Sequence, residues 1–156
     1  MNKFIIKQFN QKMTKFLPVF MVFLCSCTSQ KSAIKSESFA TIYKNQYGTT
    51  ENASYIHLTN NEDYIQFIET LHLEDFEFTN LTKVDFKEND IVVLHQGRKN
   101  TGGYQIDVAS ISWENDTLLI QKLETLPKNG EPVTMALTAP YCITVIPKAK
   151  NIRIIE

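Results

Sequence analysis

The chain has 156 residues, of which 43% are hydrophobic, and it carries 16 Lys and Arg against 17 Asp and Glu. This length accommodates one domain with short appendages, and the apolar content is ordinary for a packed core. The first 26 positions hold four of the basic residues and no acidic one, so the remainder has 12 basic and 17 acidic side chains, a net charge of −5. We therefore expect no nucleic-acid partner, because the chain has too little positive charge for a broad basic face.

Residues 1–26 are predicted to be a lipoprotein signal peptide. A basic stretch precedes the apolar run FLPVFMVFL at 16–24, which is too short to serve as a permanent membrane span. The sequence LCSC at 24–27 resembles the lipobox of bacterial lipoproteins, and this resemblance predicts that Cys27 is lipidated, with palmitate among the expected acyl chains. Two or three acyl chains hold a protein stably at a membrane. An uncleaved signal anchor is the alternative.

The segment 27–38 follows as the lipidated cysteine and a polar, flexible tether. Thr28 stands where an Asp would favour retention in the inner membrane of many Gram-negative bacteria, so we expect an envelope protein of the outer membrane, with the leaflet left open. After processing and lipidation Cys142 is the one remaining thiol, so the fold must rest on its core without an intramolecular disulfide.

The first elements of the predicted domain, residues 39–156, are two short strands and a helix. Phe39–Tyr43 and Ser54–Leu58 alternate as strands or as a ragged hairpin. Asn60 can cap the following helix. Its apolar stripe comprises Tyr64, Ile65, Phe67, Ile68 and Leu71. We interpret Leu73–Thr82 as an irregular connection, because it has no helical period.

From Val84 onward, the pattern predicts successive strands separated by turns about every ten residues. The predicted strands are Val84–Phe86, Ile91–His95, Tyr104–Trp113, Thr117–Leu123, Val133–Thr138, Tyr141–Ile146 and Ile152–Ile155, with a loop at Leu126–Pro132. The run Ile91–Leu94 predicts a strand buried on both faces, and Ile91–Val108 is interpreted as a long-looped hairpin. The predicted fold is mostly β (α+β), an antiparallel β-sandwich or barrel-like sheet with one packed amphipathic helix.

The loop of this hairpin is the candidate partner-binding site, because it carries two cations, no acid and a pair of glycines that permit close backbone approach. Its residues are Arg98, Lys99, Asn100, Thr101, Gly102, Gly103 and Tyr104. Long loops on rigid scaffolds often carry function, although solvated turn residues around a β-bulge would show the same pattern.

Catalytic and metal-binding patterns are not apparent in the sequence. The three histidines do not have the spacing of a metal site, and the chain has no nucleophile elbow, phosphate-binding loop or nucleotide fingerprint. We therefore expect no enzyme activity, no cofactor and no metal. A hydrolase that uses Cys142 as nucleophile and His95 as base stays open as a minor alternative.

The strings VDFKENDIVVLHQGRKNTGGYQIDVASI and LPKNGEPVTMALTAPYCITVIPK resemble the PrcB C-terminal domain family over about 85–148. The matching features are Gly97, Thr101, Gly102, Gly103, Tyr104, Leu126, Pro127, Thr138, Pro140, Tyr141, Pro147 and Lys148. Asn100 departs from the family, which often has Pro there. The family's namesake is a lipoprotein subunit of a surface protease complex. The resemblance therefore implies a non-catalytic partner of an envelope protease, with Pro140 and Tyr141 added to the candidate partner-binding residues.

The loop is also similar to that of chagasin-type inhibitors of cysteine proteases, which insert an N-P-T-T-G-Y/F loop into the protease cleft alongside two other loops. The other motifs of those inhibitors are missing here, so the analogy is limited to loop and scaffold. The sequence thus predicts an envelope lipoprotein that binds a protein as an accessory subunit or inhibitor-like regulator of a protease. The alternative is a small-ligand or envelope-glycan binder with a pocket between helix and sheet.

Overall fold

A computed structural model describes residues 38–156 of the chain. The predicted signal peptide, the lipidation site at Cys27 and the tether up to residue 37 lie outside the described residues. Among the helices that the structure describes, none is long and apolar enough to cross a membrane.

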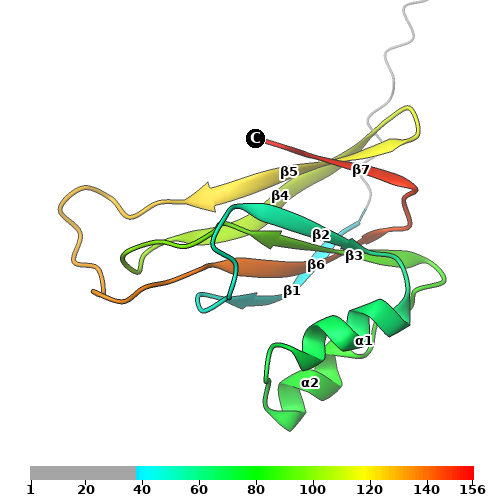
Figure 1. Cartoon of the computed structure of the whole chain (residues 1–156). Coiled ribbons are helices and arrows are strands. Elements are labelled where there is room, and N and C mark those ends of the chain that lie inside the picture. Colours follow the sequence, from blue (N-terminus) through cyan, green and yellow to red (C-terminus); the bar gives the residue numbers. More distant parts are fainter. Residues whose placement is uncertain (1–37) are drawn as a thin grey trace, which may run out of the picture. The chain divides into compact units, whose positions relative to one another are not determined.

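One of the two sheets has four antiparallel strands and holds the centre of the fold (Figure 1). Its strands, in spatial order, are β1 (Ala40–Asn45), β6 (Tyr141–Pro147), β3 (Asn89–His95) and β2 (Ser54–Leu58). The two N-terminal strands are confirmed, but they lie at opposite edges of this sheet and do not form a hairpin with each other.

The other sheet has three strands, β4 (Gln105–Glu114), β5 (Thr117–Thr125) and β7 (Asn151–Ile155), in the order β4-β5-β7. A tight turn joins β4 to β5, and Asn115 adopts the positive φ of 53° that this turn requires. The strand β7 runs parallel to β5, so this sheet is mixed, and the predicted mostly β (α+β) sandwich is confirmed. Because β7 arrives from the four-stranded sheet and not through a hairpin, no turn constrains it to be antiparallel.

The two sheets pack face to face as an open sandwich, and the helices cover the outer face of the four-stranded sheet (Figure 1). The side chains of β3 point alternately into two apolar cores, one between the sheets and one under the helices. Val92 and Leu94 enter the core between the sheets, whereas Ile91 and Val93 enter the core under the helices. The prediction of a strand buried on both faces is therefore confirmed, and β3 is shared by both cores.

The predicted amphipathic helix is confirmed as α1 (Asn61–Glu69). The Asn60 side chain accepts a hydrogen bond of 2.9 Å from the Asp63 amide, which caps the helix. Tyr64 and Ile68 are fully buried against the sheet, and the Tyr64 hydroxyl donates to the Leu81 carbonyl at 3.0 Å.

The segment Leu73–Thr82 contains a second helix, α2 (Asp75–Leu81), where the sequence was interpreted as an irregular connection. A helix of seven residues makes only two turns, so its apolar stripe is reduced to Phe78 and Leu81, which face the helix-side core. Phe76 points away and stays exposed. The hydrophobic period was too short to be recognised in the sequence.

The predicted hairpin of Ile91–Val108 is wrong, because β3 and β4 belong to different sheets. The residues between them cross from one sheet to the other. β3 is apolar on both faces and pairs with β2 and β6 on its two sides, which leaves no edge for β4. The strand β4 alternates between buried and exposed residues and forms an edge of the three-stranded sheet.

Two further predicted strands, Val84–Phe86 and Val133–Thr138, are also wrong. Residues 84–86 pass through a turn that leads into β3. In the second segment Thr138 makes one isolated bridge to Lys99, and residues 133–137 have no strand partner in the part of the chain that the structure describes. The apolar side chains of Met135 and Leu137 are therefore exposed instead of packed in a sheet.

Candidate functional site

Three segments that connect the strands meet at one end of the sandwich, on the left in Figure 1. They are the 46–53 segment after β1, the 96–104 loop after β3 and the 126–140 segment after β5. The 96–104 loop contains the residues predicted to bind a partner, and it lies between the other two. Its shape is set by hydrogen bonds to both neighbours.

The 126–140 segment binds the 96–104 loop along one side. Lys99 and Thr138 exchange two backbone hydrogen bonds of 2.7 and 3.0 Å, and the Thr138 hydroxyl donates to the Thr101 carbonyl at 2.8 Å. The Gly102 amide donates to the Thr134 carbonyl at 2.9 Å. These contacts satisfy backbone groups of a loop that has no strand partner on this side.

The 46–53 segment holds the other side of the loop through Glu51. The Arg98 amide donates to the Glu51 carbonyl at 3.0 Å, and the Arg98 guanidinium forms an ion pair with the Glu51 carboxylate. Both side chains are exposed, so the pair orders the loop more than it stabilises the fold. A groove of about 320 Å³ lies here between the 46–53 segment and Leu137–Ala139, with Arg98 on its wall.

The paired glycines of the loop face the protein's own 126–140 segment. A Cβ atom on Gly102 would collide with the Thr134 hydroxyl oxygen. Gly103 has a φ of +88°, and a Cβ atom there would lie 3.0 Å from Pro127 and 3.2 Å from Val133. Gly103 is therefore required by its backbone conformation, whereas Gly102 leaves room for the Thr134 side chain, whatever else approaches them.

The remaining loop residues differ in exposure. Arg98 and Asn100 are exposed, while Lys99 and Tyr104 are half-buried, with the Lys99 ammonium 5.5 Å from the centre of the Tyr104 ring. Thr101 is half-buried beneath Thr138. The side chains best placed to meet a partner are therefore those of Arg98 and Asn100.

Pro140 and Tyr141, the other predicted site residues, are buried. The Pro140 carbonyl accepts a hydrogen bond of 2.9 Å from the Gln96 amide, and the Tyr141 ring stacks on His95 at 5.7 Å. Burial raises the pKa of Tyr141 and lowers that of His95. Together with Tyr104, Pro140 and Tyr141 line a cavity of about 200 Å³, so the structure brings these three predicted residues together.

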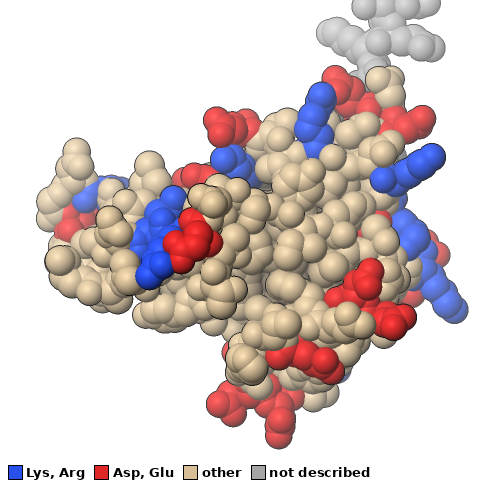
Figure 2. Space-filling model, viewed as in Figure 1, with Lys and Arg blue, Asp and Glu red and all other residues tan. Residues whose placement is uncertain are grey.

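Sequence reasoning missed the exposed apolar side chains at this end of the molecule. Tyr47, Met135 and Leu137 have exposed fractions of 69%, 89% and 55%. Figure 2 shows the protruding end at the left as largely uncharged surface with small groups of adjoining basic and acidic side chains, whereas acidic groups gather over the helices at the bottom. Met135 and Leu137 had been assigned to a strand, so their exposure was not recognisable from the pattern. We call Tyr47, Met135 and Leu137 the apolar rim.

The Cys142 and His95 side chains do not form a nucleophile and base pair. Cys142 is fully buried in the core between the sheets, while His95, paired with Tyr141 in the β3–β6 register, lies on the opposite face. Burial raises the pKa of the Cys142 thiol to about 11. A buried thiol with a raised pKa is a poor nucleophile.

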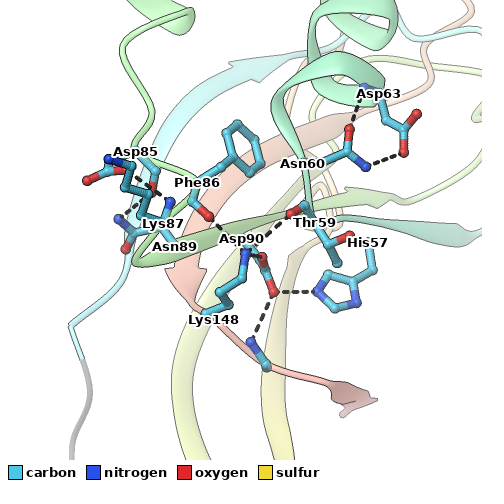
Figure 3. Close-up of polar contacts among 11 residues, drawn as sticks. His57, Thr59, Asn60, Asp63, Asp85, Phe86, Lys87, Asn89, Asp90 and Lys148 are labelled. Carbon is cyan, nitrogen blue, oxygen red and sulfur yellow. Dashed lines mark hydrogen bonds and ion pairs between the residues drawn. The ribbon is translucent and has the colours of Figure 1, made fainter.

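A second polar cluster surrounds Asp90, which is 1% exposed at the start of β3 (Figure 3). Its carboxylate accepts from Lys148 Nζ at 3.2 Å and from the Ala149 amide at 3.0 Å, and it lies 3.2 Å from His57 Nε2. Lys148 also donates to the carbonyls of Phe86 and Thr59. Because every contact of this carboxylate ties strands or turns together, the cluster is structural.

The helix–sheet interface, where a ligand pocket was the sequence-based alternative, is a closed apolar core. Tyr64 is fully buried there, and none of the four cavities described is lined by a residue of either helix. Within residues 38–156 no group of three or more His, Cys, Asp or Glu side chains could hold a metal ion.

Fold and site together define a small two-sheet α+β sandwich. It has a helix pair on one outer face and, at one end, three connecting segments that are hydrogen-bonded to one another. Residues 91–147, which comprise β4, β5, β6, most of β3 and two of the three connections at the candidate site, match the family model described as PrcB C-terminal. The sequence resemblance to the PrcB C-terminal family is therefore confirmed for this segment. No curated protein and no solved structure matches the chain.

Proposed function

We propose that the chain is a lipid-anchored protein of the bacterial envelope whose β-domain binds another protein, as an accessory subunit or inhibitor-like regulator of a protease. The binding surface is the end of the sandwich formed by the 96–104 loop and the apolar rim. The protease partner is inferred from the PrcB C-terminal family, and the anchor from the lipobox-like residues before Cys27.

The observation that carries this proposal is the combination of a loop held on both sides with exposed apolar side chains next to it. A loop fixed by hydrogen bonds to Glu51 and Thr138 loses little conformational entropy on binding. Exposed aromatic and aliphatic groups such as Tyr47 and Leu137 provide the area that anchors an interface, and Arg98 provides a charged rim. The flanking 46–53 and 126–140 segments extend the analogy to inhibitors that use three loops.

The test is affinity capture from an envelope extract with residues 28–156 as bait. Leu137→Asp places a charge on the apolar rim, and Leu123→Asp is the matched control, because the two leucines are 55% and 52% exposed. We expect the native bait and the control to retain the same protease, and the rim variant to lose it. The captured protease is then assayed for cleavage with and without the chain, which separates an accessory role from inhibition.

Equal retention by all three baits, or retention of no protease, would remove the support for this surface. The lipid anchor has its own test. Incorporation of an alkyne-labelled fatty acid into the native chain is expected, and it should be lost in Cys27→Ser.

A further inference from the structure

Among the described strands, β2 has a free outer edge, and it contains no Lys, Arg, Asp or Glu. Of the strands that the structure describes, β3 alone pairs with β2, in an uninterrupted register from Ser54–His95 to Leu58–Ile91. Tyr55 and Ile56 are 49% and 36% exposed, one toward the three-stranded sheet and one toward the helix side, as their partners Leu94 and Val93 indicate. Within residues 38–156, the backbone groups on the other side of this strand have no strand partner.

The other three edge strands that the structure describes are protected. β1 carries Lys44 and a register shift between Thr41 and Tyr43, and β4 carries Asp107 and a shift between Val108 and Ser110. β7 carries Arg153, paired with Glu114. Charges and bulges are the devices by which proteins prevent a foreign strand from joining an edge. β2 has neither device, although it has two exposed apolar side chains.

A cavity of about 240 Å³ adjoins the inner side of this edge. Its apolar wall is formed by Tyr55, Leu94, Ile106 and Ile154. Small-molecule sites usually occupy about 300–1,000 Å³, so a cavity of this size suits one inserted side chain better than a free ligand. Lys122, Glu124 and Glu156 form its charged border, in which two carboxylates face one ammonium group.

We propose that β2 is a strand-addition site, which accepts an extended segment of a partner protein as a fifth strand of the four-stranded sheet. The row of unpaired backbone groups requires an extended polypeptide backbone as occupant. An apolar side chain of that segment enters the cavity beside Tyr55, and a neighbouring Lys or Arg meets the excess negative charge of Glu124 and Glu156. The proposal does not rest on the proposed function, because it uses no residue of the 96–104 loop or the apolar rim.

A second copy of this chain is a poorer occupant than a basic extended segment. Pairing two β2 edges would bring together only five residues from each chain. Five residues bury much less than the roughly 1,200–2,000 Å² of surface that a stable interface buries. It would also supply no positive charge for the carboxylate border, since β2 itself has no Lys or Arg.

The experiment selects phage-displayed random peptides against the purified full-length chain in detergent, with Ile56→Lys and Ile42→Lys as a matched pair. Both isoleucines lie on edge strands and are 36% exposed, but Ile42 is on the protected edge β1. We expect enriched peptides with an apolar residue next to Lys or Arg. A synthetic peptide from the selection should bind the native chain and Ile42→Lys equally, and Ile56→Lys about tenfold or more weakly. Far-UV circular dichroism confirms that both variants fold.

The backbone requirement is tested by N-methylation of the selected peptide at successive positions. Strand addition predicts loss of binding at every second residue only, because alternate amides of a strand point toward the sheet. The proposal would be overturned if no peptide is enriched or if Ile56→Lys binds the peptide as well as the native chain. It would also be overturned if the effects of N-methylation do not recur at every second residue. A dimer of the native chain that is lost only in Ile56→Lys would assign the edge to a second copy and overturn it as well.

Discussion

At the scale of single residues, three glycines with positive φ provide a graded test of local constraint. Gly97, Gly103 and Gly130 have φ values of +77°, +88° and +85°. A Cβ atom would meet nothing within 4 Å at Gly130, side chains at 3.0 and 3.2 Å at Gly103, and the Ala53 backbone nitrogen at 2.7 Å at Gly97. Replacement by Ala should therefore destabilise the fold by about 1–3 kcal/mol at Gly130. The loss should be larger at Gly103 and largest at Gly97.

Urea unfolding of the three Ala variants measures this order, with Gly130→Ala as the control that isolates the backbone contribution. An equal loss of stability in Gly103→Ala and Gly130→Ala would mean that the contacts with Pro127 and Val133 relax without a cost in free energy. The outcome also decides how loop variants are used in binding experiments, since a Gly103 variant that loses stability cannot report on partner contact alone.

The candidate site shows what residue patterns can and cannot reveal. The sequence predicted the 96–104 loop as a special segment from its charges and paired glycines, and the structure places Arg98 and Asn100 at the surface there. The internal contacts of Gly102 and Gly103 come from Thr134 and Pro127, more than 20 residues away, so no local pattern contains them. Pro140 and Tyr141 carry family features but are buried, because they support the loop from beneath.

At the scale of elements, Asp107 links the two sheets by joining β4 to β1. Thr41 donates a hydrogen bond of 2.6 Å to its carboxylate, and Lys44 forms an ion pair with it. Burial raises the pKa of Asp107, but this effect is outweighed by the hydrogen bonds from Lys44, Thr41 and the Val108 amide, which bring the pKa below 3.8. A carboxylate with a lowered folded-state pKa stabilises the fold above its unfolded-state pKa and loses this contribution as the pH falls below that value.

Asp107→Asn should therefore destabilise the fold at pH 7 and have a smaller effect at pH 3, because below the unfolded-state pKa the unfolded chain takes up the proton and the contribution of the native carboxylate falls. The measurement is the difference in urea midpoint between native and variant chains at the two pH values. Asp116→Asn, in the exposed turn between β4 and β5, serves as the control variant. An Asp107→Asn effect that is as large at pH 3 as at pH 7 would show that the side chain acts through packing and not through its charge.

Elements with their own periodicity were predictable, and elements defined by distant partners were not. The helix α1 and the strands β2 and β5 were found from local alternation, capping and turns. The pairing of β3 was missed because a strand buried on both faces needs two partners, and these are β2 and β6, with β6 nearly 50 residues further along the chain. The segment Val133–Thr138 has the composition of a strand, so the pattern predicts one. Whether a partner strand lies beside it depends on distant residues, which the pattern does not contain.

At the scale of the whole molecule, the four-stranded sheet lies between two apolar cores, and this arrangement predicts cooperative unfolding. The core between the sheets and the core under the helices both depend on β3 and β6. Loss of either core exposes one face of these central strands to water, which removes support for the other core. The helices should therefore not unfold independently of the three-stranded sheet.

Trp113, the only tryptophan of the chain, reports on this coupling because it lies on β4 and packs against the core between the sheets. Ile68→Val thins the helix-side core, and Ile120→Val is the matched change between the sheets, since both isoleucines are fully buried. Each should reduce the free energy of unfolding by about 1 kcal/mol. Both should shift one urea transition that Trp113 fluorescence and far-UV circular dichroism report identically. The contrary result is that Ile68→Val shifts the transition measured by circular dichroism but not the transition measured by Trp113 fluorescence. The helix pair would then unfold as a separate unit, because β3 and β6 would stay paired after the helices are lost.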